Sequence, residues 1–121
     1  HIPGCTYTTP EVASVGMTEQ ACAQAGREVL IGKFPFTASG KATAAGSRDG
    51  MVKVIFDKET GEWLGCHLIG DNVTEMISGA VVAMSQKVTV KDLLNAVHPH
   101  PTLSEAIMEA AAAACNEAIH I

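Results

Sequence analysis

Apolar and polar residues alternate most clearly over residues 51–70, MVKVIFDKETGEWLGCHLIG. Val52, Val54 and Phe56 fall on one face of an extended chain, and the DKETGE that follows supplies residues that favour a turn. The apolar run WLGCHLI then returns, so the pattern predicts an antiparallel hairpin. His67 lies on its second strand, and we interpret it as a structural histidine rather than a functional one.

The residues near the start of the chain predict one short strand and one short helix. Residues 4–18 indicate a strand that is broken at Pro10 and followed by a connector. Thr18 is suited to cap a helix over EQACAQA, because its hydroxyl can accept a hydrogen bond from a free amide of the first turn. Gly26 is suited to end this helix.

A further strand is expected over residues 27–36, REVLIGKFPF. Gly32 and Pro35 place it at an edge of the sheet or at a bulge. Residues 37–50, TASGKATAAGSRDG, then predict a long loop of small side chains. A loop of this length in a compact domain is usually functional, disordered or packed on another surface.

Three helices are predicted after the hairpin. The first begins where Asn72 and Glu75 have the spacing of a capping box. Its apolar positions repeat at helical spacing and are Val73, Met76, Ile77, Ala80, Val81 and Met84. The second is short, with Thr89 as its N-cap and Asp92 in its first turn. The third has a stripe of small and apolar residues, namely Leu103, Ile107, Ala110, Ala111 and Ala114.

Strands first and helices last predict an α+β fold, with an antiparallel sheet flanked by helices and residues 1–121 as one domain. Hydrophobic residues make up 47 % of the chain and charged residues only 17 %, against about 25 % charged in a typical domain. So few charges cannot cover a small domain, and we expect a partner subunit or further parts of a longer chain to cover apolar surface. The chain does not begin with Met, as expected of a fragment or a processed chain.

Charge and cysteine usage exclude several functions. A net charge of -5 without a basic run argues against nucleic-acid binding. No apolar run reaches the roughly 20 residues that span a bilayer, and no secretory signal opens the chain. The cysteines are widely spaced and form no CxxC pair, so we expect buried free thiols in a reducing compartment; they are Cys5, Cys22, Cys66 and Cys115.

The stretch HPHPTLSE, residues 98–105, carries the candidate chemistry. A proline follows both His98 and His100, which pushes each histidine toward extended backbone and makes a stiff segment before a helix. Thr102 and Glu105 have the spacing of a capping box, in which the carboxylate returns to the backbone amide of the threonine.

Two other interpretations of this stretch stay open on the residues alone. Glu105 could accept a hydrogen bond from one ring nitrogen of His100 and leave the other nitrogen as a general base for a thiol or hydroxyl. A metal site of His98, His100 and Glu105 is the less favoured interpretation, because alternate residues of an extended chain point to opposite sides.

Three stretches together resemble one known family across essentially the whole chain. They are YTTPEVASVGMTE, GMVKVIFDKETGEWLGCHLIG and TVKDLLNAVHPHPTLSEA. Each is similar to a part of the C-terminal dimerisation (interface) domain of the pyridine nucleotide-disulfide oxidoreductases, and the form His-x-His-Pro-Thr-Leu-Ser-Glu favours the lipoamide branch. Two departures from that pattern, Lys41 and Pro99, do not touch the expected chemistry.

The resemblance implies that His100 is the catalytic acid/base and Glu105 its carboxylate partner, offered across a homodimer to the other subunit's active site. His100 and Pro101 would lie near the partner's FAD. The implied reaction oxidises dihydrolipoamide, carried on the lipoyl domain of a 2-oxo acid dehydrogenase complex, to lipoamide through a redox disulfide, FAD and NAD+. The location implied is bacterial cytoplasm or mitochondrial matrix.

The FAD- and NAD-binding domains of that family are absent from this chain, which has no GxGxxG and no paired redox cysteines. We therefore expect the isolated domain to bind neither cofactor, to hold no metal and to be inactive. The alternatives are the interface domain of another disulfide oxidoreductase and a dimerisation module without catalysis.

Overall fold

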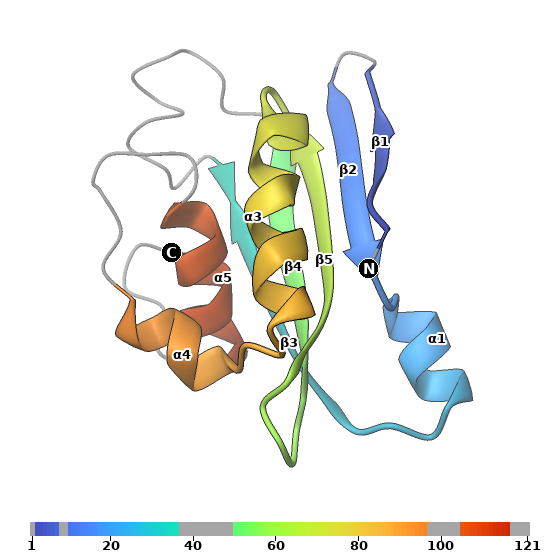
Figure 1. Cartoon of the computed structure of the whole chain (residues 1–121), viewed down its shortest axis with the longest axis vertical. Helices are drawn as coiled ribbons and strands as arrows, with labels where there is room; N and C mark the ends of the chain where they lie inside the picture. The colour runs from blue at the N-terminus through green and yellow to red at the C-terminus, as the bar shows by residue number, and fades with distance from the viewer. Residues whose placement is uncertain (1, 8–9, 37–49, 97–104, 117–121) are drawn as a thin grey trace.

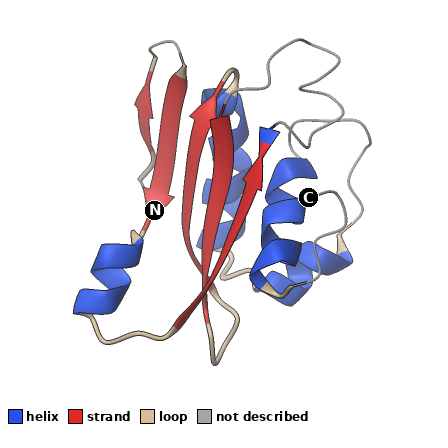
Figure 2. Ribbon diagram, turned by 180° about the vertical axis from the view of Figure 1, so that it is seen from behind, coloured by secondary structure: helices blue, strands red, loops and turns tan. Residues whose placement is uncertain are grey.

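The computed structural model describes residues 2–7, 10–36, 50–96 and 105–116. Within them, five strands form one antiparallel sheet in the order β1-β2-β5-β4-β3, and this confirms the expected α+β fold. Figure 1 shows α3 and α5 against one face of the sheet, and Figure 2 shows the same layers from behind. The elements are β1 Gly4–Thr6, β2 Glu11–Gly16, α1 Glu19–Gln24, β3 Val29–Pro35, β4 Gly50–Asp57, β5 Trp63–Gly70, α3 Val73–Ser85, α4 Val90–Asn95 and α5 Glu105–Ala114.

The predicted hairpin is confirmed as β4 and β5, the centre of the sheet. Val52, Val54 and Phe56 are fully buried and face the helices. Burying a side chain of this size stabilises a fold by about 1.5–3 kcal/mol. Phe56 also stacks on Trp63 with ring centroids 6.0 Å apart, so the two strands share one core.

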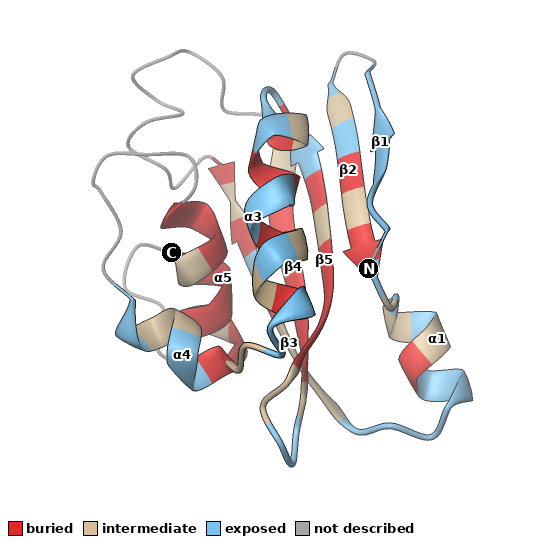
Figure 3. Cartoon of the chain, in the orientation of Figure 1, coloured by how far each residue is buried: buried red, intermediate tan, exposed pale blue. Residues whose placement is uncertain are grey.

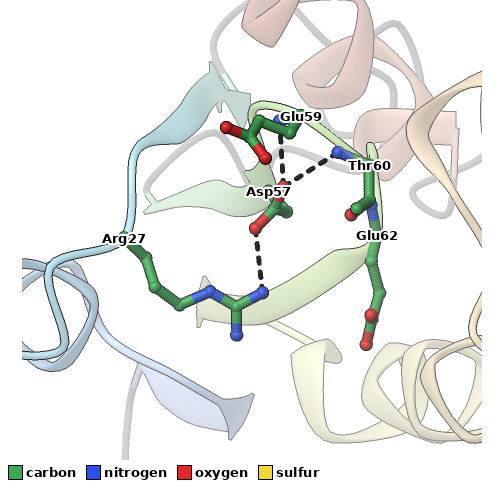
Figure 4. Close-up of polar contacts among 5 residues, drawn as sticks. All are labelled: Arg27, Asp57, Glu59, Thr60 and Glu62. Atoms are coloured by element: carbon green, nitrogen blue, oxygen red, sulfur yellow. Dashed lines mark hydrogen bonds and ion pairs between the residues drawn. The ribbon is translucent and has the colours of Figure 1, made fainter.

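The turn of this hairpin is fixed by the carboxylate of Asp57 (Figure 4). Asp57 Oδ1 accepts hydrogen bonds from the backbone N–H groups of Glu59 and Thr60, at 2.9 and 2.8 Å. The guanidinium of Arg27 donates to Oδ2 at 2.8 Å. The bond from the Thr60 backbone and the one from Arg27 lower the pKa of Asp57 from 3.8 to about 2.

The prediction of a connector after Pro10 was wrong, because Glu11–Gly16 forms the strand β2. This strand lies between β1 and β5, with Ala13 paired to Leu68 on the core side. Ala13 and Val15 are buried while their neighbours are more exposed, which is the alternation of a half-buried strand. The segment also contains small and polar residues, so the alternation is not evident in the sequence.

The capping box predicted at Asn72 was also wrong. Asn72 has a left-handed backbone, with φ at 66°, and its side chain makes no capping hydrogen bond. Glu11 of β2 supplies the cap instead: its Oε1 accepts from the Thr74 hydroxyl at 2.8 Å and from the Thr74 amide at 3.3 Å. The start of α3 is therefore held by the strand beneath it.

The predicted caps of α1 and α4 are confirmed, as are most of the predicted apolar stripes of α3 and α5. Thr18 caps α1 by accepting from the Ala21 amide, and Thr89 and Asp92 form a complete capping box at α4. The predicted apolar stripe of α3 is buried apart from the half-buried Val81. In α5 the predicted residues Ile107, Ala110, Ala111 and Ala114 are buried, and Leu103 lies outside the described residues.

The face of the sheet away from α3 and α5 is only partly covered. α1 packs there through Cys22, which lies with Ile55 and Leu64 in a second, smaller core. Free buried thiols are confirmed at Cys22 and Cys66, but that prediction was wrong for Cys5, which is exposed on the edge strand β1. β1 is an edge strand of three residues, and all three are exposed.

Candidate functional site

Only one of the predicted site residues lies in the described part of the chain. Glu105 is the first residue of α5 and is only 7 % exposed. His100 and Pro101, with His98 and Thr102, lie outside the described residues. The proposed contact between His100 and Glu105, the alternative capping box and the alternative metal site therefore stay predictions.

Glu105 is held in place because α5 packs very closely on the sheet. α5 lies over β3 and β4, and it approaches β3 at Gly32. A Cβ added to Gly32 would lie 1.8 Å from the backbone oxygen of Ala110 and 2.7 Å from the amide of Ala114. Only a glycine in the strand allows this separation, and the edge position of β3, predicted from Gly32 and Pro35, is confirmed.

The stretch 97–104 begins and ends on helices that pack on each other. α4 ends at Asn95, α5 begins at Glu105, and the two helices are in contact. α4 is itself tied down, because Trp63 of β5 donates its amide to the Val88 carbonyl at 3.0 Å. The described residues on either side of this stretch, up to Ala96 and from Glu105, therefore belong to helices that pack on the core or lie next to one.

Sequence reasoning missed a second buried carboxylate on the same helix. Glu109 is fully buried, four residues after Glu105. Side chains four residues apart lie one above the other on a helix, so both carboxylates are on one side of α5. Figure 3 shows α5 buried almost throughout its length. An acidic residue that recurs at this spacing in an Ala-rich helix was the available signal.

His67 has a hydrogen-bond partner in the fold, as expected of a structural histidine. Its Nε2 lies 2.9 Å from the carbonyl oxygen of Met17, to which it donates a hydrogen bond. This contact joins β5 to the turn before α1, fifty residues away in the sequence. The nearby ion pair of Lys53 with Glu19 joins β4 to the same helix and lowers the pKa of Glu19.

No group of three or more histidine, cysteine or acidic side chains suited to a metal occurs in the described ranges. The buried thiol of Cys66 is a weak candidate for redox chemistry, because burial raises its pKa to about 12.

No described helix is long and apolar enough to cross a membrane. With no GxGxxG in the sequence, a dinucleotide fingerprint is not among the features of this chain.

The outward side of α3 forms a surface with very little charge. No charged residue occurs between Met76 and Gln86. Val82 is 65 % exposed, and the space above Gly79 is open. Beside them lies a shallow, mostly apolar hollow of about 180 Å³ between α3, α4 and α5; its lining residues are Trp63, Met76, Gly79, Ala80, Ala83, Leu93 and Ile107. We call Gly79, Val82 and this hollow the α3 surface.

Residues 2–111 match the family described as the pyridine nucleotide-disulphide oxidoreductase dimerisation domain. The chain belongs to this family, as its motifs and its sheet with flanking helices indicated. The solved structure of the HOCl-induced flavoprotein disulfide reductase RclA from Escherichia coli has a similar fold, with a TM-score of 0.87 and 26 % identity over 92 % of this chain and 26 % of RclA.

Among individual proteins, the chain is similar to dihydrolipoyl dehydrogenases. It is 54 % identical to that of Rhizobium etli over 90 % of this chain and 23 % of the relative. It is 51 % identical to that of Zymomonas mobilis over 99 % of this chain and 26 % of the relative. The chain thus spans about a quarter of the length of these relatives.

Proposed function

We propose that this chain is the dimerisation domain of a dihydrolipoyl dehydrogenase and lends a His100–Glu105 pair to the active site of a partner subunit. The observation that carries the proposal is Glu105, a carboxylate buried in the first turn of α5. It directly follows HPHPTLS, in a chain about half identical to dihydrolipoyl dehydrogenases.

The pair would act as an oriented general base. Glu105 accepts a hydrogen bond from one ring nitrogen of His100, which fixes the tautomer and raises the basicity of the other nitrogen. That nitrogen takes the proton from a thiol of dihydrolipoamide, and the thiolate attacks a disulfide of the partner's active site. The mixed disulfide then resolves to lipoamide and leaves a reduced dithiol. FAD, when bound by the full enzyme, supplies the transfer of two electrons from that dithiol to NAD+.

The position of Glu105 suits this role. A carboxylate in the first turn of a helix is stabilised by the helix dipole, by about 0.3–1 kcal/mol at an exposed site. Because α5 packs on β3 at Gly32, the helix backbone that carries Glu105 is held against the sheet. A rigid second group is what keeps a catalytic imidazole in one orientation.

Within the described residues, the α3 surface is suited to contact a second copy. Gly79 lets another helix approach closely, Val82 offers an apolar contact, and no charge between Met76 and Gln86 opposes burial. Ile107, which lines the hollow, is two residues from Glu105. A copy seated on α3 would therefore lie near the start of α5, in keeping with a pair that acts across the dimer.

The wider assignments belong to the same proposal. The substrate is dihydrolipoamide on the lipoyl domain of a 2-oxo acid dehydrogenase complex, and the enzyme uses FAD and NAD+ held by domains outside these 121 residues. Such an enzyme works in the bacterial cytoplasm or the mitochondrial matrix. The 121-residue chain by itself should not turn over dihydrolipoamide.

The test is His100→Gln in the polypeptide that carries this domain with its FAD- and NAD-binding domains. Loss of a general base should lower lipoamide turnover by about 10²–10⁴-fold, with the dimer intact in sedimentation. His67→Gln is the matched control. His67 donates a hydrogen bond to the Met17 carbonyl, so its replacement should leave turnover nearly unchanged. Full turnover in the His100 variant would refute the assignment.

Dimerisation is tested separately with Val82→Glu, which places a charge in the α3 surface. We expect association to be lost in sedimentation, because an unpaired charge would be buried. Val12→Glu is the control, since Val12 is also exposed, at 40 %, but on β2. If only the Val12 variant loses the dimer, the interface lies on the sheet and not on the α3 surface.

A second candidate is the interface domain of another disulfide oxidoreductase of the family. The likeness to RclA, described as a flavoprotein disulfide reductase, favours it. Comparing dihydrolipoamide with other dithiol and disulfide substrates on the full enzyme distinguishes the two, because the proposed function requires a clear preference in kcat/KM for dihydrolipoamide.

A further inference from the structure

A hollow of about 370 Å³ lies where the β4–β5 turn, the start of α4 and the end of α5 meet. Figure 1 shows the turn and α4 at the same end of the molecule. Ligand pockets typically have volumes of about 300–1,000 Å³, so this one has room for a small molecule. It shares no lining residue with the hollow beside α3. We call it the α4 hollow.

The more buried part of the α4 hollow is aliphatic. Its apolar lining residues are Leu30, Val90, Leu94 and Cys115. Three of them, Leu30, Leu94 and Cys115, pack against the core but are only half-buried. A ligand with an apolar body would remove this remaining surface from water, which favours binding. None of the lining residues is aromatic, so the hollow offers no ring on which a planar base could stack.

Two lysines line the exposed part of the α4 hollow, Lys58 in the turn and Lys91 in α4. Neither lysine takes part in the ion pairs of the described residues. Their ammonium groups are therefore available to an anion. An ammonium acts as a point charge and lacks the flat fork of an arginine, so the pair selects for negative charge rather than for a particular planar group.

One acidic residue, Glu59, lines the same hollow and opposes an anion. Glu59 also lines a neighbouring polar hollow beside Arg27, and its backbone amide holds the turn through Asp57 (Figure 4). The other lining residues are uncharged, so the α4 hollow has two positive charges against one negative charge. Removing the Glu59 carboxylate should therefore strengthen the binding of an anion.

We propose that the α4 hollow binds a small aliphatic carboxylate, with its hydrocarbon part on Leu30 and Leu94 and its charged end at Lys58 and Lys91. The inference goes beyond the proposed function and does not rest on it. The hollow contains neither residue of the proposed catalytic pair and no part of the α3 surface. A ligand bound there would join the β4–β5 turn to α4 and to the end of α5.

The experiment uses the full enzyme, with hexanoate as the probe and the labelling of Cys115 by N-ethylmaleimide as the local measurement. Cys115 lines the hollow, so bound hexanoate should slow its labelling, which mass spectrometry of the peptides follows. Half-maximal protection is expected at a concentration on the order of 1 mM for a ligand of this size. Cys5 is exposed on β1, far from the hollow in the sheet order, and its labelling should not change.

Two further probes separate charge from apolar contact. Hexanamide has the shape of hexanoate without its charge, so it should protect Cys115 less, by about 2–5-fold in concentration for each exposed charge pair that is lost. Acetate has the charge without the hydrocarbon part and should protect little at the same ionic strength.

Variants of the exposed residues test the same point without affecting the core. The double variant Lys58→Gln, Lys91→Gln should require several-fold more hexanoate, and Glu59→Gln should require less. Lys33→Gln is the matched control, because Lys33 is exposed on β3 and does not line the hollow. Each variant is compared with itself with and without hexanoate, so a change in the reactivity of the thiol cancels.

Three results would overturn the inference. Equal protection by hexanamide, or an unchanged requirement in the double lysine variant, would show that the hollow does not recognise a carboxylate. Absence of protection at about ten times the expected concentration would show that it binds no such ligand. If Cys115 of the full enzyme does not react even without hexanoate, another part of the enzyme covers the hollow. None of these results bears on the His100→Gln test, so the two proposals fail separately.

Discussion

Replacing Gly32 with alanine should displace the helix that begins at Glu105. Gly32 lies on β3 directly beneath α5. The added Cβ would meet the backbone oxygen of Ala110 at 1.8 Å and the backbone amide of Ala114 at 2.7 Å. Because both obstacles are main-chain atoms, no side-chain rotation can relieve the clash, and α5 or β3 has to move.

The size of the effect follows from these distances. Cβ atoms essentially never approach other heavy atoms within 3.0 Å, so the helix and strand must separate by about 1.2 Å, the gap between 3.0 and 1.8 Å. Overpacking of a core typically costs about 1–3 kcal/mol, and an obstacle made of backbone puts this case near the upper end. For 121 residues, about 3 kcal/mol corresponds to a Tm lower by roughly 12 °C.

Thermal unfolding of the chain followed by circular dichroism measures this change. Gly4→Ala is the matched control, because a Cβ there would lie 3.7 Å from the Ser14 hydroxyl, an ordinary contact. In the full enzyme Gly32→Ala should also lower turnover by about 10²-fold, the usual effect of misplacing a catalytic group by about 1 Å. A Gly32 variant that melts within 2–3 °C of wild type, about the effect of 0.5–0.8 kcal/mol, would refute the view that this glycine sets the position of α5.

Three further predictions concern the fold. Asp57→Asn should lower the Tm most near pH 7, which melting at several pH values will check. The pKa of Asp57 is depressed to about 2, so the stabilisation by its carboxylate is complete above about pH 4 and is lost as the pH falls toward 2. Cys5 should react rapidly with a thiol reagent in the folded chain. Cys66 is buried and its pKa is raised to about 12, so it should react only after unfolding. Labelling of Cys66 in the native state would contradict its burial. Thr89→Ala should destabilise the chain by about 1 kcal/mol, or roughly 4 °C in Tm, through loss of the α4 cap, and an unchanged Tm would show that the cap contributes nothing.

The elements that could be predicted from the sequence are those defined by local pattern. The hairpin of β4 and β5 combines alternating residues with turn chemistry, and the caps at Thr18 and Thr89 use hydrogen bonds that span three residues. The errors came where a distant residue decided the outcome. Glu11 caps α3 from 63 residues away, which removes any need for a cap from Asn72. No pattern around Asn72 contains that information.

The site shows the same limit in another form. Glu105 is a candidate from its place in HPHPTLSE, because residue types and spacing carry the signal, and its role stays a prediction. Glu109 was missed, because an amphipathic pattern assumes that one side of a helix faces water. α5 has residues covered on nearly every side, including Ala106 and Ala112, so an acidic residue that would be expected at the surface is inside.

The small residues of α5 connect these observations. A helix packed through bulky side chains can shift as those side chains change rotamer, whereas contact between the backbone at Ala110 and Gly32 has no such freedom. The same helix turns Ile107 toward the hollow beside Gly79 on α3. If a second copy binds at that surface, as we propose, it would contact α5, the helix that begins at Glu105. Val82→Glu should then reduce turnover in step with dimer loss as the enzyme is diluted, and full activity in a monomeric variant would separate the two roles of the domain.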